Sequence, residues 1–104
     1  MQIIMRQVKL SVENISSCLC TFYNNGKANV MLIDNVQTKE EFKGRGYGIK
    51  LIEKAIDLAK KQNVDSVELN VNRDNLAAIN LYKKSGFEKT NKDYYRLILN
   101  KWTT

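Results

Sequence analysis

The chain has 104 residues, enough for one domain with its own core, and a formal net charge of +6. It has no histidine and two cysteines, which excludes Ser-His-Asp and Cys-His catalysis and a zinc site of cysteine and histidine ligands. This charge is compatible with nucleic acid, a membrane surface or a polyanionic small molecule as the partner. The basic residues are spread along the chain, which does not favour nucleic acid.

We expect a single cytoplasmic domain, residues 1–104, because the sequence has no pattern of a targeting or membrane-spanning segment. No apolar stretch approaches the roughly 20 residues that cross a bilayer, and the first residues lack the basic-then-apolar order of a signal peptide. Cys18 and Cys20 are two apart on a predicted strand, so they point to one face and are poorly placed to bridge each other. Two free thiols fit a reducing compartment.

Residues 2–38 predict three antiparallel strands. Residues 2–12 alternate loosely between apolar and polar side chains, and residues 16–23 form the second strand. Asn24-Asn25-Gly26 favours a tight hairpin turn because Asn and Gly tolerate positive φ. The returning strand, residues 27–38, has apolar side chains on both faces and should lie centrally in the sheet. These side chains are Val30, Leu32 and Val36 on one face and Met31 and Ile33 on the other.

Asp34 interrupts this apolar strand. A carboxylate among buried residues needs a partner or a chemical function, because an unpaired buried charge is costly. The alternative is that Asp34 lies at the solvated end of the strand.

The stretch Lys43-Gly44-Arg45-Gly46-Tyr47-Gly48 follows that strand and precedes a helix. Its glycines allow a tight turn, and a helix start presents unpaired N–H groups and partial positive charge. Lys43, Arg45 and Lys50 crowd this positive end, which indicates an anion and predicts a phosphate cradle. The alternative is a plain connector. The stretch is neither a P-loop nor a dinucleotide fingerprint.

Residues 49–61 predict an amphipathic helix with apolar side chains at 49, 52, 55, 56 and 59. Residues 64–71 then alternate cleanly, and the crossover helix requires this strand to run parallel to the third. A second helix, residues 76–84, ends before Gly86, and residues 87–90, a turn at 91–93 and residues 94–102 form a last hairpin. The expected fold is a mixed α+β sheet of about six strands, mostly antiparallel with one central parallel pair, and two helices.

The second helix carries a further chemical candidate. Asn75, Ala78, Ile79 and Tyr82 fall at i, i+3, i+4 and i+7 and so share one face. A tyrosine hydroxyl can protonate a thiolate or alkoxide leaving group. The alternative is that Tyr82 is a core aromatic residue with its hydroxyl at the rim.

Together these motifs resemble the GCN5-related N-acetyltransferase (GNAT) family. The phosphate-binding pattern of that family, Gln/Arg-x-x-Gly-x-Gly/Ala after a strand, corresponds here to residues 43–48. Its second signature, Asn-x-x-Ala-x-x-x-Tyr-x-x-x-Gly-Phe, is complete as Asn75, Ala78, Tyr82, Gly86 and Phe87. The two signatures occur in the family's order and separation over residues 30–90.

The resemblance implies a GNAT-like acyl-CoA N-acyltransferase fold with acetyl-CoA as the donor and no metal. The phosphate loop, residues 43–48, would hold the pyrophosphate through backbone N–H groups. The backbone of Val36, Gln37 and Thr38 would pair with the pantetheine and polarise the acetyl carbonyl, and Asn75 would fix the pantetheine arm. Tyr82 would protonate the departing CoA thiolate after direct attack by a primary amine. The two parallel strands should part at their ends and leave a slot for the pantetheine.

A base is also needed, because an alkylammonium cannot attack until it loses a proton. Asp34 occupies a place where family members often carry an acidic residue and is the first candidate, acting directly or through water. Glu68 is the second, and solvent is the third.

The sequence departs from the family at three points. Lys43 stands where Gln or Arg is usual, which keeps the charge but not the fork of donors. Glu40 stands where proline is frequent. The strand and the one or two helices that normally precede the first strand, and usually cover the acceptor amine, are absent from this sequence.

We therefore expect an N-acetyltransferase acting on a primary amine of a protein lysine, a protein N-terminus or a small molecule. The alternative is a catalytically silent module on the same fold that binds acyl-CoA or a protein. Because the acceptor side lacks its usual cover, we expect another chain to complete it, either a second copy in a homodimer or a macromolecular substrate.

Overall fold

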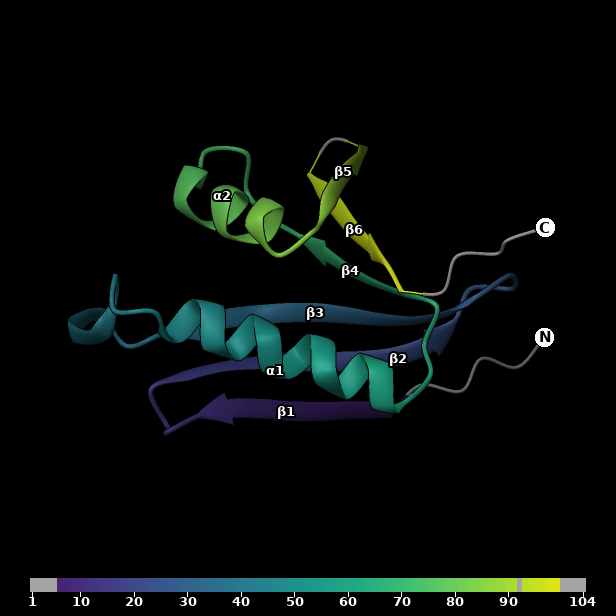
Figure 1. The fold of residues 1–104 in the computed structure, drawn as a ribbon, viewed down its shortest axis with the longest axis horizontal. Helices are drawn as coiled ribbons and strands as arrows, with labels where there is room; N and C mark the ends of the chain where they lie inside the picture. Colours follow the sequence, from purple (N-terminus) through teal and green to yellow (C-terminus); the bar gives the residue numbers. More distant parts are fainter. Residues whose placement is uncertain (1–5, 92, 100–104) are drawn as a thin grey trace.

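The computed structural model of the chain describes residues 6–91 and 93–99 (Figure 1). Its elements are, in order, β1 (Arg6–Val12), β2 (Ser16–Asn24), β3 (Asn29–Thr38), the 3-10 turn η1 (Glu40–Phe42), α1 (Tyr47–Lys61), β4 (Ser66–Asn70), α2 (Leu76–Lys84), β5 (Glu88–Asn91) and β6 (Tyr94–Ile98). Parts of three expected elements lie outside the described residues: residues 2–5 of the first strand, Lys92 of the last turn, and residues 100–102 of the last strand.

The six strands form one mixed sheet in the order β1-β2-β3-β4-β6-β5. β3 and β4 are the parallel pair, and every other neighbouring pair is antiparallel. This confirms the mixed sheet expected from the sequence, with its parallel pair in the middle. Among the described residues, no helix is long and apolar enough to cross a lipid bilayer.

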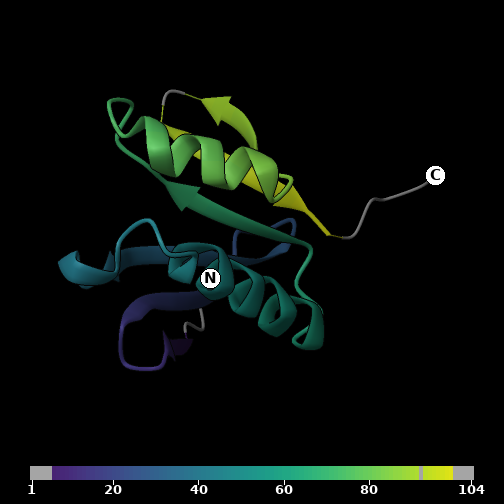
Figure 2. The same cartoon turned by 60° about the vertical axis from the view of Figure 1, so that its left-hand side comes forward.

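Both helices cover the same face of this sheet. Figures 1 and 2 show α1 lying over β1, β2 and β3, and α2 lying over β4 and β6. The strand registers turn one set of apolar side chains toward the helices, and these form the core with both helices: Cys18, Cys20, Met31, Ile33, Val67, Leu69 and Tyr95. The other face of the described sheet is predominantly polar and carries cross-strand contacts such as Gln7 Nε2 to Thr21 Oγ1 at 3.1 Å.

The buried face of α1 differs slightly from the expected one. Leu51, Ile52, Ala55 and Ala59 are fully buried, whereas Ile49 is 45% exposed. The helix begins at Tyr47, two residues before the expected start, and the burial of Leu51 places Ile49 at the edge of the apolar stripe. Burial of Leu51 and Ile52 stabilises the fold by roughly 1.5–3 kcal/mol for each side chain.

A β-bulge bends β3 at Asn35. Leu19 of β2 pairs with Asp34 and Ser17 pairs with Gln37, so two residues of β3 face one residue of β2. Asn35 has a φ of +53°, which Asn tolerates, and its N–H donates to Asp34 Oδ1 at 2.7 Å. The extra residue reverses the alternation beyond Asp34. Val36 therefore does not share a face with Val30 and Leu32, as the sequence pattern had indicated.

Candidate active site

The candidate site lies where β3 and β4 part. Their parallel ladder runs from Val30 paired with Ser66 to Ile33 paired with Leu69, and it ends there. Beyond this point residues 34–38 stay paired with β2 on one edge, while within the described chain their other edge has no strand partner. Figure 1 shows the two strands diverging toward the start of α1. The open edge therefore offers backbone N–H and C=O groups to an extended ligand.

Two hollows follow this open edge. The inner hollow, about 260 Å³, is lined by Ile33, Asp34, Asn35, Val36, Thr38, Gly48, Leu69, Asn70, Val71, Asn72, Asn75, Ala78, Leu81 and Tyr82. The loop hollow, about 550 Å³, is lined by Val36, Gln37, Thr38, Phe42, Lys43, Gly44, Tyr47, Gly48, Asn75, Ala77, Ala78 and Leu81. Val36, Thr38 and Gly48 are among the residues that line both, so the two hollows adjoin and connect the glycine loop with Tyr82.

A larger hollow, about 580 Å³, lies between α1 and β6 and is lined by residues such as Ile56, Leu81 and Leu97. It borders neither the open edge of β3 nor the glycine loop nor Tyr82. It is the largest of the three hollows by a small margin, but the other two are lined by the open edge of β3, the glycine loop and Tyr82. We therefore place the site at the open edge of β3.

The glycine loop has the backbone that the sequence predicted. Gly44 and Gly46 have φ values of +79° and +89°, a region that glycine adopts without strain, and no protein atom lies within 4 Å of a Cβ built on either. Gly46 is the N-cap of α1 and brings no side-chain hydrogen bond to the first turn, which also contains no acidic residue. The N–H groups at the start of α1 thus remain available to an anion.

The third glycine has a different role. A Cβ built on Gly48 would lie 3.3 Å from Leu81 Cδ2, although the φ of Gly48 is ordinary. Gly48 therefore lets the first turn of α1 approach α2 closely at the junction of the two hollows. Sequence reasoning assigned all three glycines to phosphate binding and missed this packing contact.

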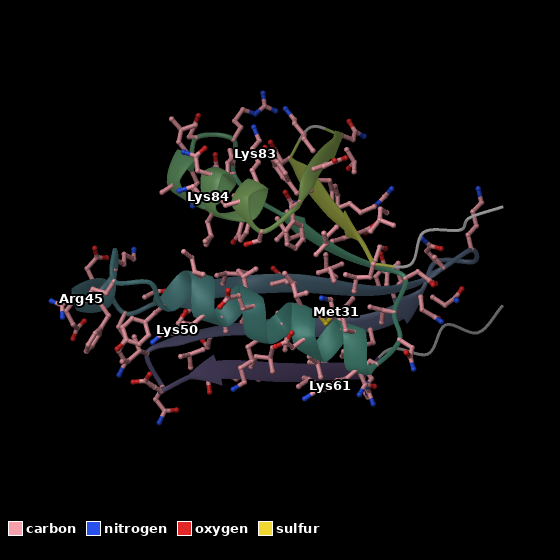
Figure 3. The ribbon with its side chains drawn as sticks, viewed as in Figure 1. Met31, Arg45, Lys50, Lys61, Lys83 and Lys84 are labelled. Carbon is pink, nitrogen blue, oxygen red and sulfur yellow. The ribbon has the colours of Figure 1, made fainter. Side chains whose placement is uncertain are left out.

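The cations of the loop and of the first turn of α1 contact neighbouring side chains. Lys43 Nζ is 3.2 Å from Glu40, with both side chains exposed, and the Arg45 guanidinium lies 5.7 Å from the ring centre of Phe42. Lys50 Nζ lies 5.4 Å from the ring centre of Tyr47. Figure 3 shows Arg45 and Lys50 near the N-terminal end of α1. Lys43 and Tyr47 line the loop hollow, whereas Arg45 and Gly46 do not.

Tyr82 lines the inner hollow from α2 and is only 5% exposed. Its ring packs at 5.9 Å from the ring of Phe87. Burial, and secondarily the neighbouring Cys18, raises the pKa of the Tyr82 phenol above its usual value. The phenol therefore stays protonated at neutral pH and can donate a proton or a hydrogen bond into the hollow.

The structure separates the two candidate bases. Asp34 is exposed, lines the inner hollow together with Tyr82, and accepts a hydrogen bond from the N–H of Asn35. Glu68 lines neither hollow. Its Oε2 lies 3.1 Å from both Nε and Nη2 of Arg96, and its Oε1 accepts from the Tyr23 hydroxyl at 3.3 Å. Asp34 is thus the carboxylate at the site, and Glu68 has structural partners.

Asn75 borders both hollows and is also the N-cap of α2, where its Oδ1 accepts from Ala78 N–H at 3.2 Å. Two further amides at the end of β4, Asn70 and Asn72, line the inner hollow. Sequence reasoning missed both. Their signal was their position at the end of the parallel strand, where polar residues follow Leu69 and Val71.

Comparisons with known proteins place this arrangement in a family. The family described as "Acetyltransferase (GNAT) family" matches residues 7–87. An uncharacterised N-acetyltransferase of Methanocaldococcus jannaschii is 42% identical over 74 residues, which cover 70% of this chain and 33% of that protein. N-alpha-acetyltransferase 30 of Saccharomyces cerevisiae is 34% identical over 68 residues, covering 65% of this chain and 38% of that protein. The chain thus matches about a third of the length of these relatives.

Solved structures share the fold. A chain of the NatC complex bound to Gag peptide and CoA superposes with a TM-score of 0.78 at 23% identity, over 83% of this chain and 62% of that one. An acetyltransferase from Bacillus cereus superposes with a TM-score of 0.72 at 18% identity, over 93% and 74%. Because the family match covers most of the sequence and its sheet and helices recur in these structures, the chain belongs to the GNAT acetyltransferase family.

Proposed function

We propose that the chain transfers an acetyl group from acetyl-CoA to a primary amine. The observation that carries this proposal is the continuity of the two hollows along the open edge of β3. It joins an anion site at the start of α1 to a buried, protonated tyrosine at the inner end. A long donor with a diphosphate at one end and a thioester at the other fits such a path.

Solved structures that share the fold support the choice of donor. One relative is the NatC complex with CoA bound. Another, a candidate streptothricin acetyltransferase from Bacillus anthracis, was solved in complex with acetyl coenzyme A and has a TM-score of 0.70 at 23% identity, over 86% of this chain and 60% of that one.

In the proposed reaction, the N–H groups of residues 44–48 hold the diphosphate and Lys43 adds charge. The pantetheine lies along the open edge of Val36, Gln37 and Thr38, next to Asn75. The free amine attacks the thioester carbonyl, forming a C–N bond, and the C–S bond then breaks. Tyr82 gives its proton to the leaving sulfur, and the proton that the attacking nitrogen then loses returns to the Tyr82 phenolate, directly or through water. Asp34 accepts the proton of the incoming ammonium, directly or through water.

The environment of Tyr82 constrains the timing of this proton transfer. Its raised pKa exceeds that of a thiol, about 8.5, so protonating a fully formed thiolate would be uphill. Transfer while the C–S bond breaks avoids this cost, because the proton then moves as charge develops on sulfur.

The acceptor remains a primary amine of a protein lysine, a protein N-terminus or a small molecule. The yeast relative named N-alpha-acetyltransferase 30 and the NatC structure with Gag peptide support a protein N-terminus. We also propose that another chain completes the acceptor side, either a second copy in a homodimer or a macromolecular substrate. In a homodimer, activity on small amines falls when the protein is diluted below its dimer constant, whereas a docking macromolecular substrate leaves small amines almost unreactive.

The test is to incubate the protein with acetyl-CoA and a panel of amines and peptides. Thiol release is followed, and the acetylated product is identified by mass. We expect amine-dependent thiol release that Tyr82→Phe reduces. Binding of acetyl-CoA without turnover on any acceptor would favour a silent acyl-CoA-binding module instead.

A further inference from the structure

A fourth hollow lies near the site on the helix-free face of the sheet. It measures about 490 Å³ and lies at the end of the β1–β2 hairpin, where Lys9, Ser11, Ser17, Gln37 and Lys39 are among its lining residues. The registers place Ser11, Ser17 and Gln37 in one row across β1, β2 and β3. The neighbouring row consists of Lys9, Leu19 and Asp34. Because Asp34 lines the inner hollow, this hollow lies one row away from a residue of the site.

The hollow is positively charged. Lys9 and Lys39 are its only charged lining residues, and within the described chain neither ammonium forms an ion pair with a carboxylate. Among the other lining side chains, the Ser16 hydroxyl bonds Thr38 Oγ1 at 2.9 Å and Gln37 Nε2 donates to Asn35 Oδ1 at 2.7 Å. The hydroxyls of Ser11 and Ser17 are left to donate hydrogen bonds into the hollow. A further cation is close, because Lys54 Nζ donates to the carbonyl of Ser11 at 2.8 Å. Such a hollow attracts an anionic group and repels a cationic one.

The distance to Asp34 follows from the sheet. Lys9 and Asp34 lie on β1 and β3, separated by two strand spacings, which is about 10 Å. We propose that this hollow binds an anionic group of the acceptor, a carboxylate or a phosphate, while the amine of the acceptor reacts beside Asp34, whose backbone lies about 10 Å from that of Lys9. The inference rests on the proposed acetyl transfer and narrows its acceptor class to amines that carry a remote negative charge.

The test compares two acceptors that differ only in charge. One is a straight-chain ω-amino acid whose amine and carboxylate are about 10 Å apart, and the other is its neutral primary amide. The double variant Lys9→Gln/Lys39→Gln should lower kcat/KM for the acid about tenfold through KM, and change kcat/KM for the amide less than twofold. The matched control is Lys27→Gln/Lys61→Gln, which removes the same charge from exposed positions outside the hollow and should leave both acceptors unchanged.

An equal loss for acid and amide, or an equal loss in the control variant, would overturn the inference. A binding measurement separates it from the proposed function. Titration with citrate, followed by backbone amide NMR without any CoA, should shift the signals of Ser11, Ser17 and Lys39 in the unmodified protein and leave them unmoved in Lys9→Gln/Lys39→Gln. This result would support the anion subsite even if neither amine were acetylated, and its absence would refute the subsite even if both were.

Discussion

Replacing Gly46 with valine separates the structural role of the glycine loop from its proposed role in binding acetyl-CoA. Gly46 has a φ of +89°, and a Cβ there meets no protein atom within 4 Å. The cost to folding is therefore conformational and not steric, about 2 kcal/mol for a side chain held in the left-handed region. A domain of this size would lose roughly 8–16 °C in Tm and still fold.

Gly26→Val is the matched control. Gly26 lies in the β2–β3 hairpin with a φ of +95° and equally open surroundings, so its variant carries a similar conformational cost at the opposite end of β3 from the glycine loop. Acetyl-CoA at a hundredfold excess over its dissociation constant should raise the free energy of unfolding of the unmodified protein and of Gly26→Val by about 2.7 kcal/mol. It should add almost nothing to Gly46→Val, because the new side chain occupies the approach to the N–H groups of the first helical turn.

The assay is thermal unfolding of the three proteins with and without acetyl-CoA. If Gly46→Val folds and gains as much stability from acetyl-CoA as Gly26→Val, the loop does not hold the diphosphate.

Three other predictions concern the inner hollow. Tyr82→Phe should leave acetyl-CoA binding intact and reduce kcat by roughly 10²-fold, and an unchanged kcat in steady-state turnover would remove Tyr82 from the reaction. Asp34→Asn should lower turnover with little change in Tm. Glu68→Gln should keep turnover and lower stability by about 1 kcal/mol, because its pairing with Arg96 is weakened. If melting and rate measurements on both variants give the reverse pattern, the roles of the two residues are exchanged. The folded-state pKa of Tyr82 is raised, so its contribution to stability is fully present below pH ~10, the pKa of an unfolded tyrosine, and is lost as pH rises through the higher folded value. In denaturant unfolding from pH 9 to 12, the free energy of unfolding should therefore decline less steeply for Tyr82→Phe than for the unmodified protein. Identical slopes would contradict this.

The sequence was sufficient for the order of elements, and several of its candidate site residues lie together in the structure. Alternating apolar residues located the strands, the crossover helix required β3 and β4 to be parallel, and glycine spacing placed the loop before α1. The second signature placed Asn75 and Tyr82 on one helix face, and both line the inner hollow. These features depend on local patterns, which a single sequence carries.

The features that could not be predicted depend on contacts between distant segments. The bulge at Asn35 is a shift in the register between β2 and β3, and this shift determines on which face of the sheet Val36 lies. The close approach at Gly48 involves Leu81, which lies on the other helix. Glu68 looked equivalent to Asp34 until its pairing with Arg96, on a strand formed much later in the chain, was visible.

If acetyl-CoA lies along the open edge of β3 with its diphosphate at the start of α1, binding should protect the backbone amides there. Amide hydrogen exchange followed by NMR, with and without CoA, reports each N–H separately and can detect this protection. We expect slowed exchange at Val36, Thr38, Gly46 and Gly48, with no change at Gly26. Protection confined to other residues, or none at saturating CoA, would contradict it.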